Sequence, residues 1–135
     1  MTISLQRLDG QPLAQRLRIR GHTLQADTSE ANGGGDAGPS PHDLYDAALG
    51  ACKAITVLSY ARRKGIPVDE IETEIVRDDS QERAGSYRLT AKLRIRGALT
   101  DAQLGELARV ADKCPLHKLM TAVTTGVVSQ VGRLG

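Results

Sequence analysis

One long predicted helix constrains the fold of this chain more than any other feature. Ser40 suits an N-cap, Pro41 the first helical position, and Asp43 the place of a capping-box acid. The run HDLYDAALGACKAITVLSYARRKG follows and ends near Gly65, with three cations at its negative end. Small residues crowd its first half: Ala47, Ala48, Gly50, Ala51 and Ala54. We therefore expect a thin, widely apolar helix, most of it buried.

The core around this helix must be unusual, because the chain has no Phe, no Trp and only three Tyr. Leu, Ile, Val and Ala carry the packing, which favours close contact through small residues. A length of 135 residues, with 40% hydrophobic and 25% charged residues, is ordinary for a globular domain. We therefore expect a single domain over residues 1–135.

Composition also argues against several classes of function. Base stacking needs aromatic platforms, and the net charge is only +2, so we expect no nucleic-acid partner. No secretory leader is recognised and no apolar run approaches the roughly 20 residues that span a membrane, so we expect no membrane partner. Two cysteines are too few for a secreted disulfide scaffold. The expected location is the cytoplasm.

Short alternating runs lie on both sides of the helix and predict strands. Three of them, ISLQRLD, LAQRLRIR and HTLQAD, precede it and are separated by turn signals at Asp9-Gly10 and Gly21. Two more, IETEIVRDD and SYRLTAKLRIRG, follow it around the turn QERAG. The glycine-rich residues 28–39 lack the GxxxxGK[ST] frame of a phosphate-binding loop, so we interpret them as a connection.

The C-terminal third predicts two more helices, over residues 100–113 and 116–126, and a last short strand over residues 127–134. The expected fold class is α+β, with one antiparallel sheet around a long buried central helix.

The stretch KCPLHKL contains one of the two cysteines, at a helix start. Pro115 suits the first helical position, which makes Cys114 the N-cap and His117 the third helical residue. The free N–H groups and the positive helix end favour a thiolate there, and Lys113 and Lys118 add to this. On these residues alone, Cys114 is either a reactive thiol or a simple junction between two helices.

The other cysteine, Cys52, presents the opposite picture. It lies roughly 18 Å along the helix from Ser40, too far for the helix dipole to act. A thiol among alanines is expected to be buried and inert unless a cation from elsewhere in the fold stabilises its thiolate. Lys53 follows it directly but points about 100° around the helix.

Two separated motifs resemble the OsmC/Ohr family of organic hydroperoxide reductases. The first is GGGDAGPSPHDLYDAALGACKAITVLSYARRKGIPVD, and the second is KCPLHKLM, with HTLQAD before both. The sequence is most similar to the OsmC-like branch. The resemblance implies an OsmC-like fold and an intertwined homodimer, with sheets around two central helices and active sites at the subunit interface.

The resemblance also implies thiol-dependent reduction of organic hydroperoxides, without a cofactor or metal. Cys52 would be the peroxidatic cysteine and Cys114 the resolving one. The sulfenic acid formed on Cys52 would condense with Cys114 to a disulfide, which an external dithiol reduces. A lowered pKa at Cys114 would suit the second step.

In the family, an arginine held by a glutamate stabilises the peroxidatic thiolate. The glutamate position is His42 here, so Asp43 is the candidate acid, as in the OsmC-like branch. Arg20 is the first candidate for the arginine, with Arg18 and Arg7 as rivals. Strand alternation places Arg18 and Arg20 on one face.

Two other interpretations stay open. Cys52, Cys114 and His117, with His42 or His22, could supply four zinc ligands. The chain could also be a non-catalytic dimeric binding module for an apolar small molecule. For the enzyme, an apolar interface pocket of Leu, Ile, Val and Met120 would favour organic over inorganic peroxides.

Overall fold

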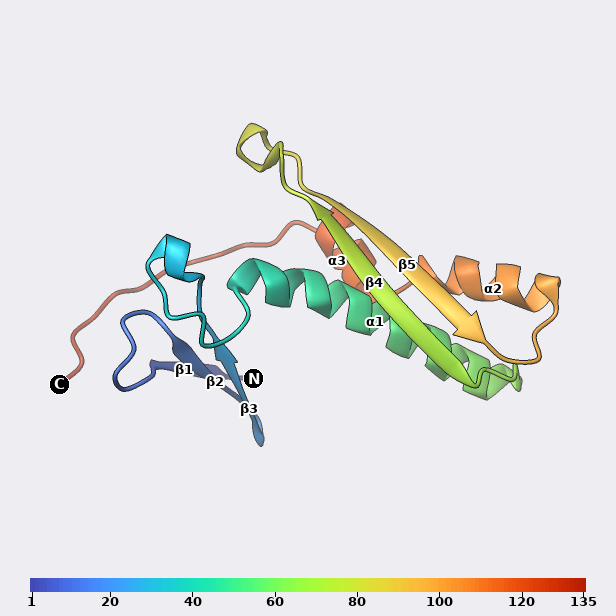
Figure 1. Cartoon of the computed structure of the whole chain (residues 1–135), viewed down its shortest axis with the longest axis horizontal. Helices are drawn as coiled ribbons and strands as arrows, with labels where there is room; N and C mark the ends of the chain where they lie inside the picture. The colour runs from blue at the N-terminus through green and yellow to red at the C-terminus, as the bar shows by residue number, and fades with distance from the viewer. The chain divides into compact units, whose positions relative to one another are not determined.

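The structure is a computed structural model that describes residues 1–135 (Figure 1). The strands are β1 (Ile3–Arg7), β2 (Gln15–Ile19), β3 (His22–Ala26), β4 (Glu70–Asp78) and β5 (Arg88–Arg96). The helices are α1 (Pro41–Lys64), α2 (Asp101–Ala111) and α3 (Pro115–Ala122), with short 3₁₀ turns at Glu30–Asn32 and Glu82–Ala84. Antiparallel strands combined with helices confirm the α+β fold class.

The N-terminal strands form a meander in the order β1-β2-β3. Leu17 pairs with Leu5 on one side and Leu24 on the other, so three leucines form a row across the sheet. The last pair of β2 and β3 joins Ile19 to His22, which leaves a two-residue turn between them. The three predicted strands are thus confirmed.

Strands β4 and β5 form a separate two-stranded sheet, a long hairpin in Figure 1. Exposed and half-buried residues alternate along both strands, because successive side chains of a strand point to opposite faces. The predicted single sheet is wrong, since no backbone pairing joins the hairpin to the meander. Each sheet pairs only strands that are neighbours in the sequence, which short turns allow.

Helix α1 begins with the predicted capping box. The Asp43 amide donates to Ser40 Oγ (3.1 Å), and the Ser40 amide donates to Asp43 Oδ2 (3.0 Å). The helix ends before Gly65, which has φ 70° and suits glycine.

The buried face of α1 carries charged as well as apolar residues. Residues 46, 49, 50, 53, 57 and 61 are buried, and two of them are the charged Asp46 and Lys53. By contrast, Ala48, Ala51 and Ile55 are exposed. The prediction that most of α1 is buried is wrong for the single chain, because no element of this chain covers that side.

The chain divides into two compact units, each built from two stretches of sequence. Residues 1–50 and 74–92 form the first, and residues 51–73 and 93–135 form the second. The prediction of one domain over residues 1–135 stays a prediction. The core of the second unit consists of Val57, Ala61, Ile66, Leu107 and Ala111. The second half of α1 packs there against α2, with β-strand side chains such as Ile71 and Leu93 at its edge.

In the first unit, one carboxylate organises the glycine-rich loop. Asp27 is buried, and its Oδ2 accepts hydrogen bonds from the Gly35 and Ala37 amides at 3.1 and 3.0 Å. Its Oδ1 accepts from the Thr28 amide at 2.7 Å. Gly34 passes so close to Thr28 that a Cβ would lie 2.3 Å from its carbonyl oxygen. The loop is therefore a packed connection around an anion, not a phosphate cradle.

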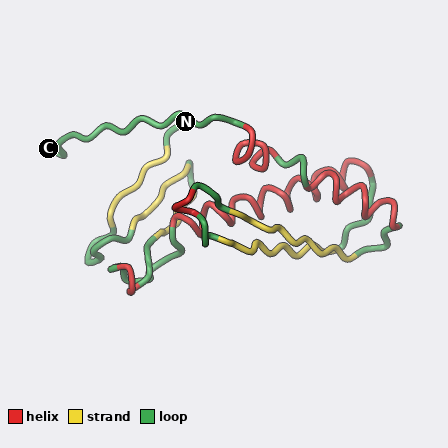
Figure 2. The backbone as a smooth tube through the Cα atoms, turned by 90° about the horizontal axis from the view of Figure 1, so that it is seen from above, coloured by secondary structure: helices red, strands yellow, loops and turns green.

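The last residues, 123–135, form no helix or strand and run as an extended loop (Figure 2). The predicted strand over residues 127–134 is therefore wrong for the single chain. A strand needs a neighbour for its N–H and C=O groups, and this segment pairs with a strand of neither sheet. None of the helices has the length and apolar character needed to cross a membrane.

We expect Asp27→Asn to lower the melting temperature by several degrees, since an amide NH₂ cannot accept from Gly35 and Ala37. The Ala37, Thr28 and Gly35 amides hold the pKa of Asp27 below its usual value, despite some opposing desolvation. Its contribution is therefore present above the unfolded value of about 3.9 and is lost as the pH falls through the folded value. Thermal unfolding at pH 7 and pH 3 measures both effects.

The matched control is Asp36→Asn, because Asp36 is exposed in the same loop and its φ of 52° suits Asn. Equal melting temperatures for the two variants at pH 7 would contradict the role assigned to Asp27.

Candidate active site

Cys114 occupies the helix start that the sequence predicts. It is the N-cap of α3, Pro115 follows at the first helical position, and the His117 amide donates to Cys114 Sγ at 3.3 Å. The side chain is almost completely enclosed, with 1% of the residue exposed. The sulfur therefore replaces the oxygen of an ordinary N-cap inside a closed environment.

The predicted lowering of the Cys114 pKa is wrong. Burial raises the pKa of this thiol, and the neighbouring Cys52 thiol raises it further. The His117 amide and the Lys53 ammonium lower it without overcoming the burial. Lys113 and Lys118, which the sequence favours as activators, are exposed. Desolvation, which no local motif reveals, therefore outweighs the helix end.

Cys52 lies in the same unit, on α1, and is half-buried. It affects the titration of Cys114, so the structure brings together the two cysteines that the sequence holds far apart. Both are free thiols, and no disulfide joins them. The expectation of a buried Cys52 is wrong, because the interior face of α1 carries Asp46 and Lys53 and the cysteine lies beside this face.

The cation at this site is Lys53, which sequence reasoning set aside. Only 4% of Lys53 is exposed. Its Nζ donates to the Ala111 carbonyl oxygen at 2.9 Å and lies 2.8 Å from His117 Nδ1. Asp112 Oδ1 lies 3.8 Å from it on the exposed side. One ammonium thus links α1 to the end of α2 and to the first turn of α3.

A signal for Lys53 exists in the sequence, although the apolar pattern conceals it. Asp46 and Lys53 are separated by two helical turns and share a face with Val57 and Ala61. Charged residues on an otherwise apolar face are expected to have buried partners.

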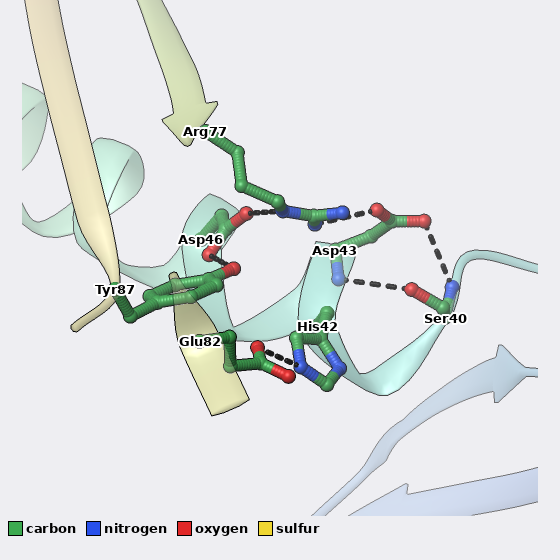
Figure 3. A network of polar contacts seen from close by, with 7 residues as sticks. All are labelled: Ser40, His42, Asp43, Asp46, Arg77, Glu82 and Tyr87. Carbon is green, nitrogen blue, oxygen red and sulfur yellow. Dashed lines mark hydrogen bonds and ion pairs between the residues drawn. The ribbon is translucent and has the colours of Figure 1, made fainter. Parts of the chain in front are cut away.

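In the first unit, Asp43 belongs to a network around Arg77 of β4 (Figure 3). Arg77 donates from Nη2 to Asp43 Oδ1 (2.8 Å) and from Nε to Asp46 Oδ2 (2.5 Å). The Tyr87 hydroxyl donates to the other oxygen of Asp46 at 2.7 Å. These carboxylates raise the pKa of Arg77. The Ser40 amide first, then Arg77, lower the pKa of Asp43.

Tyr87 is held neutral by the same network. Burial raises its pKa to about 12, and the hydrogen bond to Asp46 acts in the same direction. Sequence reasoning did not identify the network of Asp46, Arg77 and Tyr87. Arg77 and Tyr87 lie in strand patterns after α1, and such patterns do not reveal their partners.

The three candidate N-terminal arginines lie apart from this network. Arg20 is exposed in the β2–β3 turn with φ 56°, so it is not a strand residue and does not alternate with Arg18. The prediction that the two share a strand face is therefore wrong. Arg18 is exposed on β2, and Arg7 donates to the Gln11 carbonyl at 2.8 Å.

His42 replaces the family glutamate and pairs with Glu82, Nε2 to Oε1, at 2.7 Å (Figure 3). Its ring meets that of Tyr87 edge-on, with 5.9 Å between centroids. These residues, with Pro41 and Tyr45, line a pocket of about 400 Å³.

The zinc alternative is not supported by the geometry. No group of three or more His, Cys, Asp or Glu side chains could hold a metal ion. His117 Nδ1 faces the Lys53 ammonium and His42 faces Glu82, so these two nitrogens already have partners.

Comparisons with known proteins agree with this fold. The family model described as OsmC-like protein matches residues 33–128, so the chain belongs to the OsmC-like family. No curated protein matches the chain. The crystal structure of an OsmC-like protein from Mycoplasma pneumoniae is similar, with a TM-score of 0.72, 16% identity, and coverage of 90% of this chain and 87% of that one.

Two solved structures with more specific names show the same fold. An organic hydroperoxide resistance protein from Legionella pneumophila has a TM-score of 0.62 and 17% identity, over 90% of both chains. The organic hydroperoxide resistance protein OhrB of Bacillus subtilis has a TM-score of 0.57 and 19% identity, also over 90% of both chains. At this identity the likeness shows the fold.

We expect Asp46→Asn to cost about 1–3 kcal/mol of unfolding free energy, because it leaves Arg77 and Tyr87 without a buried carboxylate. Asp43→Asn is the matched control, since the Asp43 side chain is 51% exposed and an exposed ion pair contributes about 0–1 kcal/mol. Urea unfolding measures both. A larger cost for Asp43→Asn than for Asp46→Asn would contradict this ranking.

Proposed function

We propose that this chain is a thiol peroxidase that reduces organic hydroperoxides to alcohols in defence against oxidative stress. The observation that carries the proposal is a half-exposed thiol beside a buried one, in a chain with two cysteines. Membership of the OsmC-like family supports it, as do the names of the similar hydroperoxide resistance proteins.

The difference in burial assigns the order of the two thiols. Cys52 is accessible and acts as the peroxidatic thiolate, which attacks the O–O bond of ROOH. The S–O bond forms, the O–O bond breaks, and the released alkoxide takes a proton and leaves as ROH. Cys52 is oxidised to the sulfenic acid, and the peroxide is reduced.

The enclosed Cys114 then acts as the resolving thiol. It attacks the Cys52 sulfur, the S–S bond forms, the S–OH bond breaks, and water leaves. An external dithiol in the cytoplasm reduces the disulfide by thiol exchange and completes the cycle. An apolar pocket at the subunit interface that includes Met120, which is half-buried in the single chain, would favour organic over inorganic peroxides.

The proposal retains Arg20 and Asp43 as the arginine and the acid that support the Cys52 thiolate. In the single chain, Asp43 Oδ1 accepts from Arg77, and Oδ2 accepts from the Ser40 amide. An arginine that uses Asp43 must therefore share it with Arg77.

The first experiment is a free-thiol titration of the reduced protein before and after one equivalent of cumene hydroperoxide. We expect loss of both thiols per chain and a Cys52–Cys114 disulfide within one chain by mass spectrometry. Cys52→Ser should retain its remaining thiol and lose peroxide consumption. Cys114→Ser should form the sulfenic acid at Cys52 without the disulfide, which a dimedone adduct detects.

Circular dichroism of both serine variants controls for folding. Survival of both thiols in the wild-type protein under excess peroxide would sink the peroxidase assignment. The second candidate, a binding module for an apolar small molecule, would then be favoured by the aromatic pocket around Tyr45 and Tyr87. A bound ligand in the purified protein, seen by native mass spectrometry, would support that function.

We also propose the homodimer that the family resemblance implies. Ile55 is 65% exposed and Leu58 40% exposed on α1. They line an apolar groove of about 610 Å³ with Ile66, Pro67 and Val68. A second copy of the chain would cover these side chains, and the tail after residue 122 could then find a strand partner.

We expect the wild-type protein to be a dimer and Ile55→Glu to be a monomer by analytical ultracentrifugation, because a buried carboxylate opposes association. Arg83→Glu places the same charge on an exposed 3₁₀ turn and should leave the dimer intact. A monomeric wild-type protein would contradict the proposed dimer.

A further inference from the structure

The environment of Lys53 raises a chemical question, because an ammonium has three donors and no acceptor. One donor points to the Ala111 carbonyl, which ends α2 and carries part of the negative end of that helix. A second points to His117 Nδ1 at 2.8 Å. The nitrogen of a neutral imidazole can accept this hydrogen bond only if its ring proton lies on Nε2.

Only one proton can lie between Lys53 Nζ and His117 Nδ1, so the two residues share it. A proton on both nitrogens would set two cationic donors against each other at 2.8 Å in an enclosed space. The pair therefore holds a single positive charge. If Lys53 gives up its proton, the imidazole can return one to the same place.

The Lys53–His117 pair also lies next to the Cys114 thiol. The His117 amide donates to Cys114 Sγ, while the imidazole of the same residue contacts Lys53. The other groups around the ammonium are Asp112, 3.8 Å away after α2, and Cys52, which precedes Lys53 on α1. Lys113 and Lys118 are exposed. Lys53 is thus the one buried cation at these thiols.

We propose that Lys53 and His117 form a one-proton pair that stabilises the Cys114 thiolate and donates a proton when the disulfide forms. This role rests on the proposed two-cysteine function. The Lys53–His117 pair supplies a positive charge near the Cys114 thiolate. Cys114 needs this charge because burial disfavours its ionisation and the helix start does not compensate. Lys53 is a positioning cation for Cys114, and His117 orients it.

The step balances in atoms and charge. The Cys114 thiolate attacks the sulfenic sulfur of Cys52, the S–S bond forms and the S–OH bond breaks. The departing hydroxide takes the shared proton from the Lys53–His117 pair and leaves as water. One sulfur is oxidised and the other reduced, and the negative thiolate and positive pair are both neutralised. The pair then regains a proton from solvent.

The direct test is the pH dependence of alkylation in the reduced protein, followed separately for each cysteine by peptide mass spectrometry with iodoacetamide. In Lys53→Met, we expect the midpoint for Cys114 to rise by about one pH unit and its rate at pH 7 to fall about tenfold. Lys53→Arg should restore most of the rate. Lys118→Met removes an exposed lysine of the same charge and should leave the profile unchanged.

A profile for Lys53→Met that coincides with the wild type would overturn the proposal. Circular dichroism and melting temperature control for folding. A measurement without any substitution adds a second check, because the chain has only three histidines. Nitrogen NMR at pH 7 should show neutral His117 with its proton on Nε2, and a proton on Nδ1 would also overturn the shared-proton pair.

These readouts need no peroxide, so they separate the two proposals. If the wild-type protein does not react with cumene hydroperoxide but its Cys114 alkylation depends on Lys53, the peroxidase function and the proton donation are both refuted. The role of Lys53 in stabilising the Cys114 thiolate would then still stand. If Lys53→Met forms the disulfide at the wild-type rate, the peroxidase function stands and this inference fails.

Discussion

The burial of one ammonium group is the interaction on which the candidate site depends. Removing a lysine from water costs several kcal/mol unless its protons find acceptors in good geometry. Lys53 meets this requirement with a helix-end carbonyl and an imidazole, which belong to α2 and α3. The chain must therefore bring both helices to the same point on α1. Cys114, at the start of α3, arrives beside Cys52 as a result.

The same principle acts on the other half of the buried stripe of α1. Asp46 is enclosed, and it is satisfied by Arg77 of β4 and Tyr87 just before β5. The chain has no Phe or Trp, so fewer large apolar side chains are present to fix the rotation of this alanine-rich helix. Two charges on one face help to fix it, because rotating the helix would leave each charge without its partner.

Local sequence signals predicted the elements well and the site only in part. The capping box at Ser40, the stop at Gly65 and the N-cap at Cys114 depend on neighbours within a few residues, and all are present. Lys53 and Arg77 depend on partners far along the chain, so no local pattern reveals them. The Cys114 pKa was predicted with the wrong sign because helix position is visible in a sequence and desolvation is not. The C-terminal strand failed because its pattern specifies an alternating segment but not a partner strand.

The opposing environments of the two thiols follow from this arrangement and suit the different roles that we propose for them. A half-buried Cys52 can meet a peroxide, whereas an enclosed Cys114 with a raised pKa is protected from direct oxidation. In the proposed cycle, Cys114 acts as a resolving thiol only if a nearby group promotes its ionisation once the sulfenic acid has formed. Burial alone would make Cys114 inert, and an exposed helix start would make it a second target for peroxide. In our proposal, the enclosed Lys53 offsets part of the effect of burial on Cys114 while the thiol stays closed to peroxide.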